Sequence, residues 1–395
     1  MLASVLSTKF CCVSRSLRSL PGIGLRPPAP PATRGCGRRC LISRRNWFAL
    51  ASGRRHAGGM SPTTLEIVEV RADDPAAVDA VYDVLVAALR ADRPELPPLC
   101  RYQYERQFEV PAPATKRSFY LARHGDEPVG VAQLDLPHLD NLDKAHVDLY
   151  VRPDARRQGI GRALYTHALV PARADGRTSV LGFSPEGDGP NGFAAAAGLR
   201  NGLLDARRRL DLADIDDAAL DHMYAEGLVK AAGYRLVQWS NELPEEYVED
   251  LAALDSSFLA ETPMGELDYE PEQVDAARLR QLYRAFAAWG ARRYECGLVH
   301  EATGQLVAWT ALRVAKTVDW HCWQLITLVH PAHRGHRLGL VAKVANLRTL
   351  RAAEPAVTVI DTFNAADNSY MIAINEAMGF RFRDTWANWQ GPMPA

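Results

Sequence analysis

Residues 151–164 read VRPDARRQGIGRAL, and they join an apolar strand pattern to the start of a helix. Arg156, Gly159 and Gly161 form an Arg-x-x-Gly-x-Gly turn. Because glycine has no Cβ, backbone N–H groups in such a turn can approach a ligand closely, and the positive end of the following helix points at the same place. The stretch therefore predicts a phosphate-binding loop, with a pyrophosphate as its natural ligand.

The same design returns downstream, in residues 329–343, which read VHPAHRGHRLGLVAK. At equal spacing, Arg334 corresponds to Arg156. A repeat of this length indicates a tandem duplication, and 395 residues exceed what one hydrophobic core usually organises. The expected parts are a head at 1–60, two similar domains at 61–213 and 234–395, and a bridging helix at 214–233.

The head differs in composition from the rest of the chain. It contains Lys9 and ten arginines but no Asp or Glu, a charge of about +11, whereas the whole chain carries −1. A Pro-rich run and the lack of a sustained period predict disorder. The head could be a misassigned start with Met60 as the true initiator, an organelle transit peptide or an export signal. The misassigned start is the most economical of these interpretations.

Composition favours an ordinary globular protein, with 24% charged and 47% hydrophobic residues. The near-neutral charge gives no sign of a nucleic-acid partner, and no run approaches the roughly 18 apolar residues of a membrane helix. The body keeps Cys100, Cys296 and Cys322, without the paired spacing of a metal site. We therefore expect a cytoplasmic monomer or homodimer with no metal, nucleic-acid or membrane partner.

Periodicity gives both halves one order of elements: strand, two helices, three strands, helix, strand, helix, strand. Residues 64–70 alternate as a strand and residues 75–90 carry a helical apolar stripe, and the pattern restarts at Tyr234. Hairpin-connected strands with interspersed helices predict an α/β (α+β) fold. Each domain should be a mostly antiparallel mixed sheet flanked by helices.

With these motifs and this order, each half resembles the GNAT superfamily of acyl-CoA-dependent N-acetyltransferases, over roughly residues 62–395. The first loop looks like the pyrophosphate motif of that family. Residues 364–380 look like its later signature, in which an Asn opens a helix that ends in Gly-Phe. The paired arrangement is similar to tandem two-domain members such as mycothiol synthase. The resemblance implies a splayed pair of fourth and fifth strands and acetyl-CoA as cofactor, one or two per chain.

The two halves depart from the family pattern in different places. The first has Gly187 where the second has Asn368, and Ala194 where the family often has a Tyr that protonates the departing thiolate. The second has Arg337 at the first glycine position of its loop and Asn375 at the Tyr position. A side chain at Arg337 is tolerable if φ is negative there, because Gly339 and the helix N-terminus remain.

The resemblance implies cofactor contacts at both loops and at the strand ends before them. In the first half the candidates are Leu149, Val151, Arg156, Arg157, Gln158, Gly159, Ile160, Gly161 and Arg162. In the second half they are Leu328, Val329, Arg334, Gly335, His336, Arg337, Leu338, Gly339, Asn364 and Asn368. Surface charges, turn glycines and ordinary helix caps are the simpler alternatives.

His146 and Asp148 lie two residues apart on one strand face, where either could accept a proton. The alternative is a polar edge facing solvent. The corresponding positions of the second half are Gln324 and Ile326, so that half lacks this base. Asn375 is a third catalytic candidate by its place in the family pattern.

We expect direct transfer of an acetyl group to a primary amine of a small molecule. The acidic segment 261–272 could attract a cationic amine, or it could be a solvated loop. The alternative functions are a non-catalytic acyl-CoA sensor or scaffold, because the Tyr is missing in both halves, and a protein N-acetyltransferase.

Overall fold

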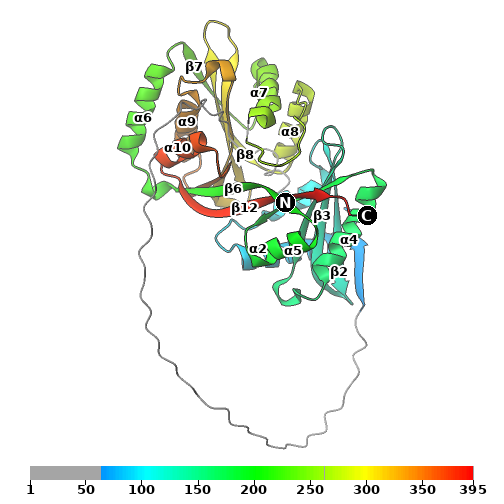
Figure 1. Ribbon diagram of the computed structural model, residues 1–395. Helices are drawn as coiled ribbons and strands as arrows, with labels where there is room; N and C mark the ends of the chain where they lie inside the picture. The colour runs from blue at the N-terminus through cyan, green and yellow to red at the C-terminus, as the bar shows by residue number, and fades with distance from the viewer. Residues whose placement is uncertain (1–63, 262, 395) are drawn as a thin grey trace, which may run out of the picture. The chain divides into compact units, whose positions relative to one another are not determined.

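The computed structural model describes residues 64–261 and 263–394, so the predicted head at 1–60 lies outside the described residues. Residues 64–211, called the first half here, and residues 234–394, called the second half, repeat one order of elements. This order is the one that periodicity predicts. Figure 1 shows the second half around α7 to α10 and the first half around α2, α4 and α5.

The first half contains six strands, and a short segment with one longer helix connects it to the second half. Their elements are β1 (Leu65–Glu69), α2 (Pro75–Asp92), α3 (Arg101–Glu109), β2 (Thr115–His124), β3 (Glu127–Pro137), β4 (Lys144–Val151), η1 (Pro153–Ala155), α4 (Ile160–Ala174), β5 (Ser179–Pro185), α5 (Asp188–Ala196), β6 (Arg200–Asp211), η2 (Leu212–Asp214) and α6 (Asp217–Lys230).

The second half follows the same course. Its elements are β7 (Tyr234–Ser240), η3 (Glu245–Tyr247), α7 (Val248–Glu261), α8 (Ala276–Ala288), β8 (Arg292–His300), β9 (Leu306–Ala315), β10 (Val318–Val329), η4 (Pro331–His333), α9 (Leu338–Ala353), β11 (Val359–Ala365), α10 (Ser369–Ala377) and β12 (Arg381–Pro392).

Short polar side chains start several of the helices. Asp74 precedes Pro75 and accepts a hydrogen bond from the N–H of Ala77 at 3.0 Å, which satisfies one of the free donors of the first turn. Asp216, Asp275 and Asn368 cap α6, α8 and α10 in the same way. Side-chain capping therefore fixes where these helices begin.

The strands of both halves join in one twelve-stranded sheet, in the order β1-β2-β3-β4-β5-β12-β6-β11-β10-β9-β8-β7. The last strand of each half is exchanged: β12 pairs with β5 of the first half, and β6 pairs with β11 of the second. Figure 1 shows β6 and β12 side by side at the centre. Most neighbours are antiparallel, while β4 with β5 and β10 with β11 are parallel, which confirms the predicted fold class.

An aromatic cluster sits where the exchanged strands meet. Trp386 of β12 stacks on Phe183 of β5, with ring centroids 5.0 Å apart, and meets Phe363 of β11 edge-on at 5.5 Å. Leu96, from the segment after α2, packs on the same cluster. Buried aromatic pairs add to area burial, so this cluster fastens the first half to the second.

The segment between α7 and α8 docks on the turn between β3 and β4 of the first half. Asn141 donates to the carbonyl of Glu270 at 3.0 Å and accepts from its N–H at 2.8 Å. Asp268 contacts Lys144 at 3.3 Å and Glu272 contacts Arg278 at 2.9 Å. The segment therefore acts as a clamp between the halves, while Glu266, Asp268 and Glu270 remain exposed to solvent.

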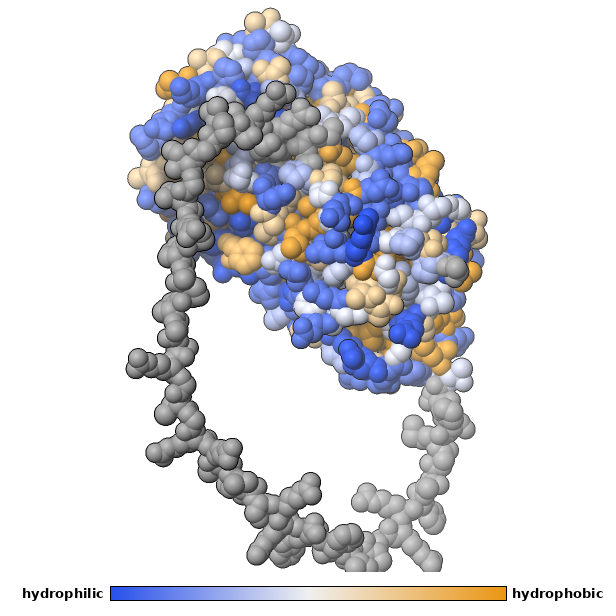
Figure 2. Space-filling view, viewed as in Figure 1, coloured by the Kyte–Doolittle hydropathy of each residue, from blue (hydrophilic) through white to orange (hydrophobic). Residues whose placement is uncertain are grey.

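The visible surface is mainly polar. Figure 2 shows hydrophilic residues over most of the face drawn, with hydrophobic residues in small scattered groups. Among the described residues, no helix combines the length and apolar character that crossing a bilayer requires.

Candidate active site

Both parallel strand pairs separate after a short paired stretch. The pairing of β4 with β5 runs from Lys144 with Ser179 to His146 with Leu181 and then stops, although both strands continue. The pairing of β10 with β11 stops in the same way after Trp323 and Asp361. Each half therefore has an opening between its parallel strands. Leu149 and Val151 belong to the part of β4 that does not pair with β5, and Leu328 and Val329 belong to the part of β10 that does not pair with β11.

The predicted phosphate loops follow these openings and lead into helices without side-chain caps. Ile160, Gly161 and Arg162 form the first turn of α4, and Leu338 and Gly339 begin α9. In contrast to the capped helices, no side chain accepts the first N–H groups of α4 or α9. Free N–H donors at the positive end of a helix suit an anion such as phosphate.

Each loop uses the left-handed backbone conformation twice. In the first loop, Arg157 has φ 64° and Gly159 has φ 86°. In the second loop, Gly335 has φ 86° and Arg337 has φ 56°. The condition of a negative φ at Arg337 is therefore not met, because the turn needs a left-handed residue there as it does at Gly159. Each loop has one glycine and one strained arginine, in opposite order.

We expect Arg337→Gly to stabilise the protein slightly. The left-handed conformation costs a non-glycine residue about 1–2 kcal/mol, and glycine removes this cost. Glycine is also more flexible in the unfolded chain, which offsets about 0.5–1 kcal/mol of the stabilisation. The lost contact of Arg337 with Glu226, at 2.8 Å, is a surface ion pair of little worth. Urea unfolding should show a gain of about 0.5–1 kcal/mol. Gly335→Ala, the reverse change in the same loop, should lose a similar amount, and a loss in both variants would contradict this explanation.

The loop side chains make contacts within the protein. Arg156 donates to the carbonyl of Val151 at 3.0 Å and forms a two-point ion pair with Asp92, at 2.7 and 3.0 Å. Gln158 lies 3.4 Å from the carbonyl of Asp154. Arg156 therefore braces its loop against α2. Arg334 follows η4 at the equivalent place, and His336 meets the carbonyl of Lys230 at 3.2 Å.

A row of polar side chains crosses the first half on the sheet face that carries α2 and α3. Arg117 of β2 holds Asp135 of β3 through two hydrogen bonds, at 2.6 and 2.7 Å. Gln133 donates to Asp135 at 2.9 Å. In the strand register, His146 lies opposite Asp135, and Asp148 lies opposite Gln133. The predicted pair of possible bases thus belongs to a buried polar network and not to a solvent-facing edge.

The two candidate bases differ in their protonation. Asp148 is 8% exposed, and burial raises its pKa to about 6. Burial lowers the pKa of His146 to about 4. The Nε2 of His146 lies 3.2 Å from the hydroxyl of Tyr269, which comes from the clamp segment of the second half. At neutral pH Asp148 is therefore an ionised acceptor for a proton, and His146 is a neutral imidazole.

The second half has a β-bulge at the corresponding place. The register of β10 shifts between Gln324 and Thr327, so that Trp323 lies opposite Arg313, the position that His146 takes in the first half. The equal-spacing alignment of Gln324 with His146 is therefore wrong by one residue. Gln324 instead donates to the carbonyls of Ala311 and Ile326, at 2.9 and 3.1 Å. The second half still has no proton acceptor in this place.

Three asparagines gather at the second opening. Asn375 of α10 donates to the side-chain oxygen of Asn364 of β11 at 2.7 Å, and Asn368 caps α10. All three are at most 1% exposed. Within residues 64–261 and 263–394, Nδ2 of Asn364, Nδ2 of Asn368 and Oδ1 of Asn375 have no hydrogen-bond partner. Buried unpaired amide groups are costly, and a ligand that carries amide groups would satisfy them.

Several residues of these sites escaped the sequence interpretation. Arg117, Gln133 and Asp135 interrupt otherwise apolar strands, and that interruption was a usable signal. Tyr269 gave no signal, because it reaches His146 from the other half of the chain. Ala194, at the family's Tyr position, is buried and offers no proton.

Comparison with known proteins gives a consistent result. Residues 78–188 match the acetyltransferase (GNAT) family. A tandem GNAT protein from the clavulanic acid biosynthesis pathway is 31% identical, over 84% of this chain and 99% of that one, with a TM-score of 0.70. No curated protein sequence matches the chain.

More distant structures share the fold. One contains a GCN5-related glucosamine N-acetyltransferase region within a fungal multi-domain GH3 β-N-acetylglucosaminidase. It is 15% identical over 84% of this chain and 38% of that one, with a TM-score of 0.61. A GCN5-related N-acetyltransferase from Sphaerobacter thermophilus is 13% identical over 83% of this chain and 96% of that one, with a TM-score of 0.56.

Proposed function

Since the chain belongs to the GNAT family of acetyltransferases, we propose that it moves an acetyl group from acetyl-CoA to a primary amine of a small molecule. The fit of the cofactor to the second half carries the proposal. Asn364, Asn368 and Asn375 present two buried amide donors and one acceptor that lack partners. The pantetheine arm of CoA contains amide groups of the complementary kind, and its phosphates suit the uncapped start of α9.

We assign the transfer step to the first half. Acetyl-CoA supplies the acetyl thioester. Asp148, buried at the opening between β4 and β5, is ionised at neutral pH and accepts the proton that the amine loses as its nitrogen bonds to the thioester carbon. The C–S bond breaks in return, and CoA leaves as its thiolate. Ile326 and Trp323 stand at the equivalent places of the second half, and neither can accept a proton. The second half would thus bind CoA without catalysing.

Counting bound cofactors tests this proposal. We expect native mass spectrometry to find two acetyl-CoA molecules on the wild-type chain and one on each of two variants. Gly161→Glu places a negative charge at the start of α4, where a Cβ meets nothing closer than 3.6 Å. Asn368→Asp keeps the cap on Met371 but replaces the free amide donor with an oxygen. Each variant is the control for the other, and absence of binding by the wild type would refute the proposal.

The acceptor is tested by release of free CoA with a panel of amines. Turnover on small amines in preference to peptides supports the proposed substrate class. Faster turnover on peptides would identify a protein acetyltransferase, and CoA binding without turnover on any amine would identify a sensor.

A further inference from the structure

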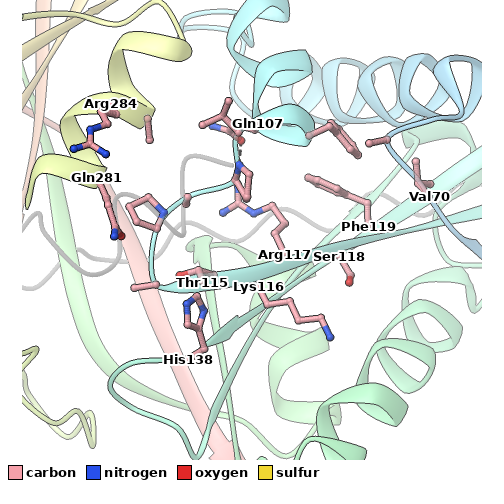
Figure 3. A pocket seen from close by; sticks show the side chains of 18 of the residues that line it. Val70, Gln107, Thr115, Lys116, Arg117, Ser118, Phe119, His138, Gln281 and Arg284 are labelled. Atoms are coloured by element: carbon pink, nitrogen blue, oxygen red, sulfur yellow. Dashed lines mark hydrogen bonds between the residues drawn. The ribbon is translucent and has the colours of Figure 1, made fainter. Parts of the chain in front are cut away.

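A separate cavity lies at the joint between the two halves. It has a volume of about 710 Å³ and is bounded by the start of β2 and the end of α3 in the first half and by α8 in the second. Figure 3 shows Thr115 to Phe119 along one side, Gln107 above them, and Gln281 and Arg284 reaching in from α8. In the strand register, the ion pair of Arg117 and Asp135 lies between this cavity and His146. The cavity is therefore distinct from the openings that follow β4 and β10.

Gln107 presents a fixed and unused donor at this cavity. Its side-chain oxygen accepts a hydrogen bond from Arg117 at 3.0 Å, drawn as a dashed line in Figure 3. A guanidinium has only donors, so the amide oxygen must face Arg117 and the amide nitrogen must face away. Gln107 is 5% exposed, and its Nε2 has no hydrogen-bond partner in the part of the chain that the structure describes. Such a buried donor requires an acceptor that the protein itself does not supply.

The charges on the cavity wall favour an anionic ligand. Lys116 and Arg284 line it, and among the described residues neither forms an ion pair. His138 lines it as well. The carboxylate of Glu69 is the opposing charge, and the hydroxyl of Ser118 donates to it at 3.0 Å. The excess of positive charge and the donor of Gln107 suit an oxygen anion.

The rest of the wall is largely apolar, with Phe108, Val110, Pro111 and Phe119 among its residues. A wall of this kind binds the hydrocarbon part of a ligand and fixes its orientation with a few polar groups. We infer that the joint binds a small organic carboxylate with an apolar body, whose oxygens meet Gln107 and Arg284. Because both halves line the cavity, such a ligand would also hold them together.

Hexanoate is a suitable probe, with hexanol and inorganic phosphate as partial ligands. We expect calorimetry of the full chain at pH 7.5 and low salt to show hexanoate binding at least tenfold more tightly than either, and hexanoate should raise the unfolding temperature. If hexanol bound as tightly as hexanoate, the result would contradict the anion site. Phosphate binding equally well would contradict the apolar part.

Gln107→Glu is the decisive variant, because it keeps an oxygen for Arg117 and replaces the free donor with an anionic oxygen. We expect it to bind hexanoate at least tenfold more weakly. Gln107→Met removes the donor without adding charge. If Gln107→Glu does not fold, Gln107→Met serves as the test variant in its place.

Arg284→Gln should also weaken hexanoate binding and should reduce the salt dependence of that binding. Arg280→Gln is the control, because it removes the same charge from α8 at a residue that pairs with Glu245, and it should leave hexanoate binding unchanged. Normal binding by both Gln107 variants, or equal losses in the two α8 variants, would overturn the site.

Discussion

Cutting the chain between η2 and α6 is expected to give two fragments that fold only together. Fragment 1–214 contains β5 and β6 but lacks β12, which lies between them in the sheet. Fragment 215–395 lacks β6, which separates β12 from β11. Each fragment alone loses three ladders of hydrogen bonds, β5 with β12, β12 with β6 and β6 with β11, together with the stacking of Trp386 on Phe183. This loss is comparable with the 5–15 kcal/mol that stabilises a typical domain.

Circular dichroism and urea unfolding of each fragment and of the mixture measure this effect. We expect no cooperative transition from either fragment and a single one from the mixture. A fragment 1–214 extended by β12 through a short linker restores the order β5-β12-β6, so it should fold alone. A cooperative transition from the unextended fragment 1–214 would show that the exchanged strand is dispensable.

Asp148→Asn is expected to slow acetyl transfer by about 10²–10⁴-fold, the usual contribution of a positioned general base. The base must be ionised to accept a proton, and burial raises the pKa of Asp148 to about 6. The wild-type rate should therefore fall as the pH decreases through about 6 and stay level above it. Rate profiles of both proteins with one amine measure this, and the variant should lack the acidic decline.

The same variant should be more stable than the wild type at pH 7. The folded protein holds the proton of Asp148 more tightly than the unfolded chain, so stability falls as the pH rises from about 4 to about 6 and remains lower above. Asparagine avoids this cost, which amounts to at most about 3 kcal/mol. Asp154→Asn, on an exposed carboxylate of the following loop, should change neither rate nor stability much. If Asp148→Asn transferred the acetyl group at a rate within threefold of the wild type, Asp148 would not be the base.

The sequence predicted what local chemistry determines. The order of the elements, the turns after residues 151 and 329 and the helices that follow these turns depend on residues close together in the chain, such as Arg156, Gly159 and Gly161. The conformation of Arg337 was missed because a whole loop can hold one strained residue when its neighbours fix the turn. The bulge in β10 was missed because an extra residue in an apolar strand leaves the hydrophobic pattern intact.

Long-range placement was beyond the sequence. A strand shows its alternation but not its neighbours, so β12 reads the same whether it pairs within its own half or with β5. For the same reason nothing in the segment around Tyr269 indicated that it meets His146. The asparagines of the second half were predicted by resemblance, but their unpaired atoms became visible only in three dimensions.

The exchange of β6 and β12 has a consequence for the evolution of the chain. When a gene duplicates, one copy ordinarily becomes free to decay once the other supplies the activity. Here neither copy can be discarded, because each completes the sheet of the other. Selection for folding would thus preserve a half long after its own chemistry had lapsed, and that half would be available for new ligands while its partner kept the original reaction.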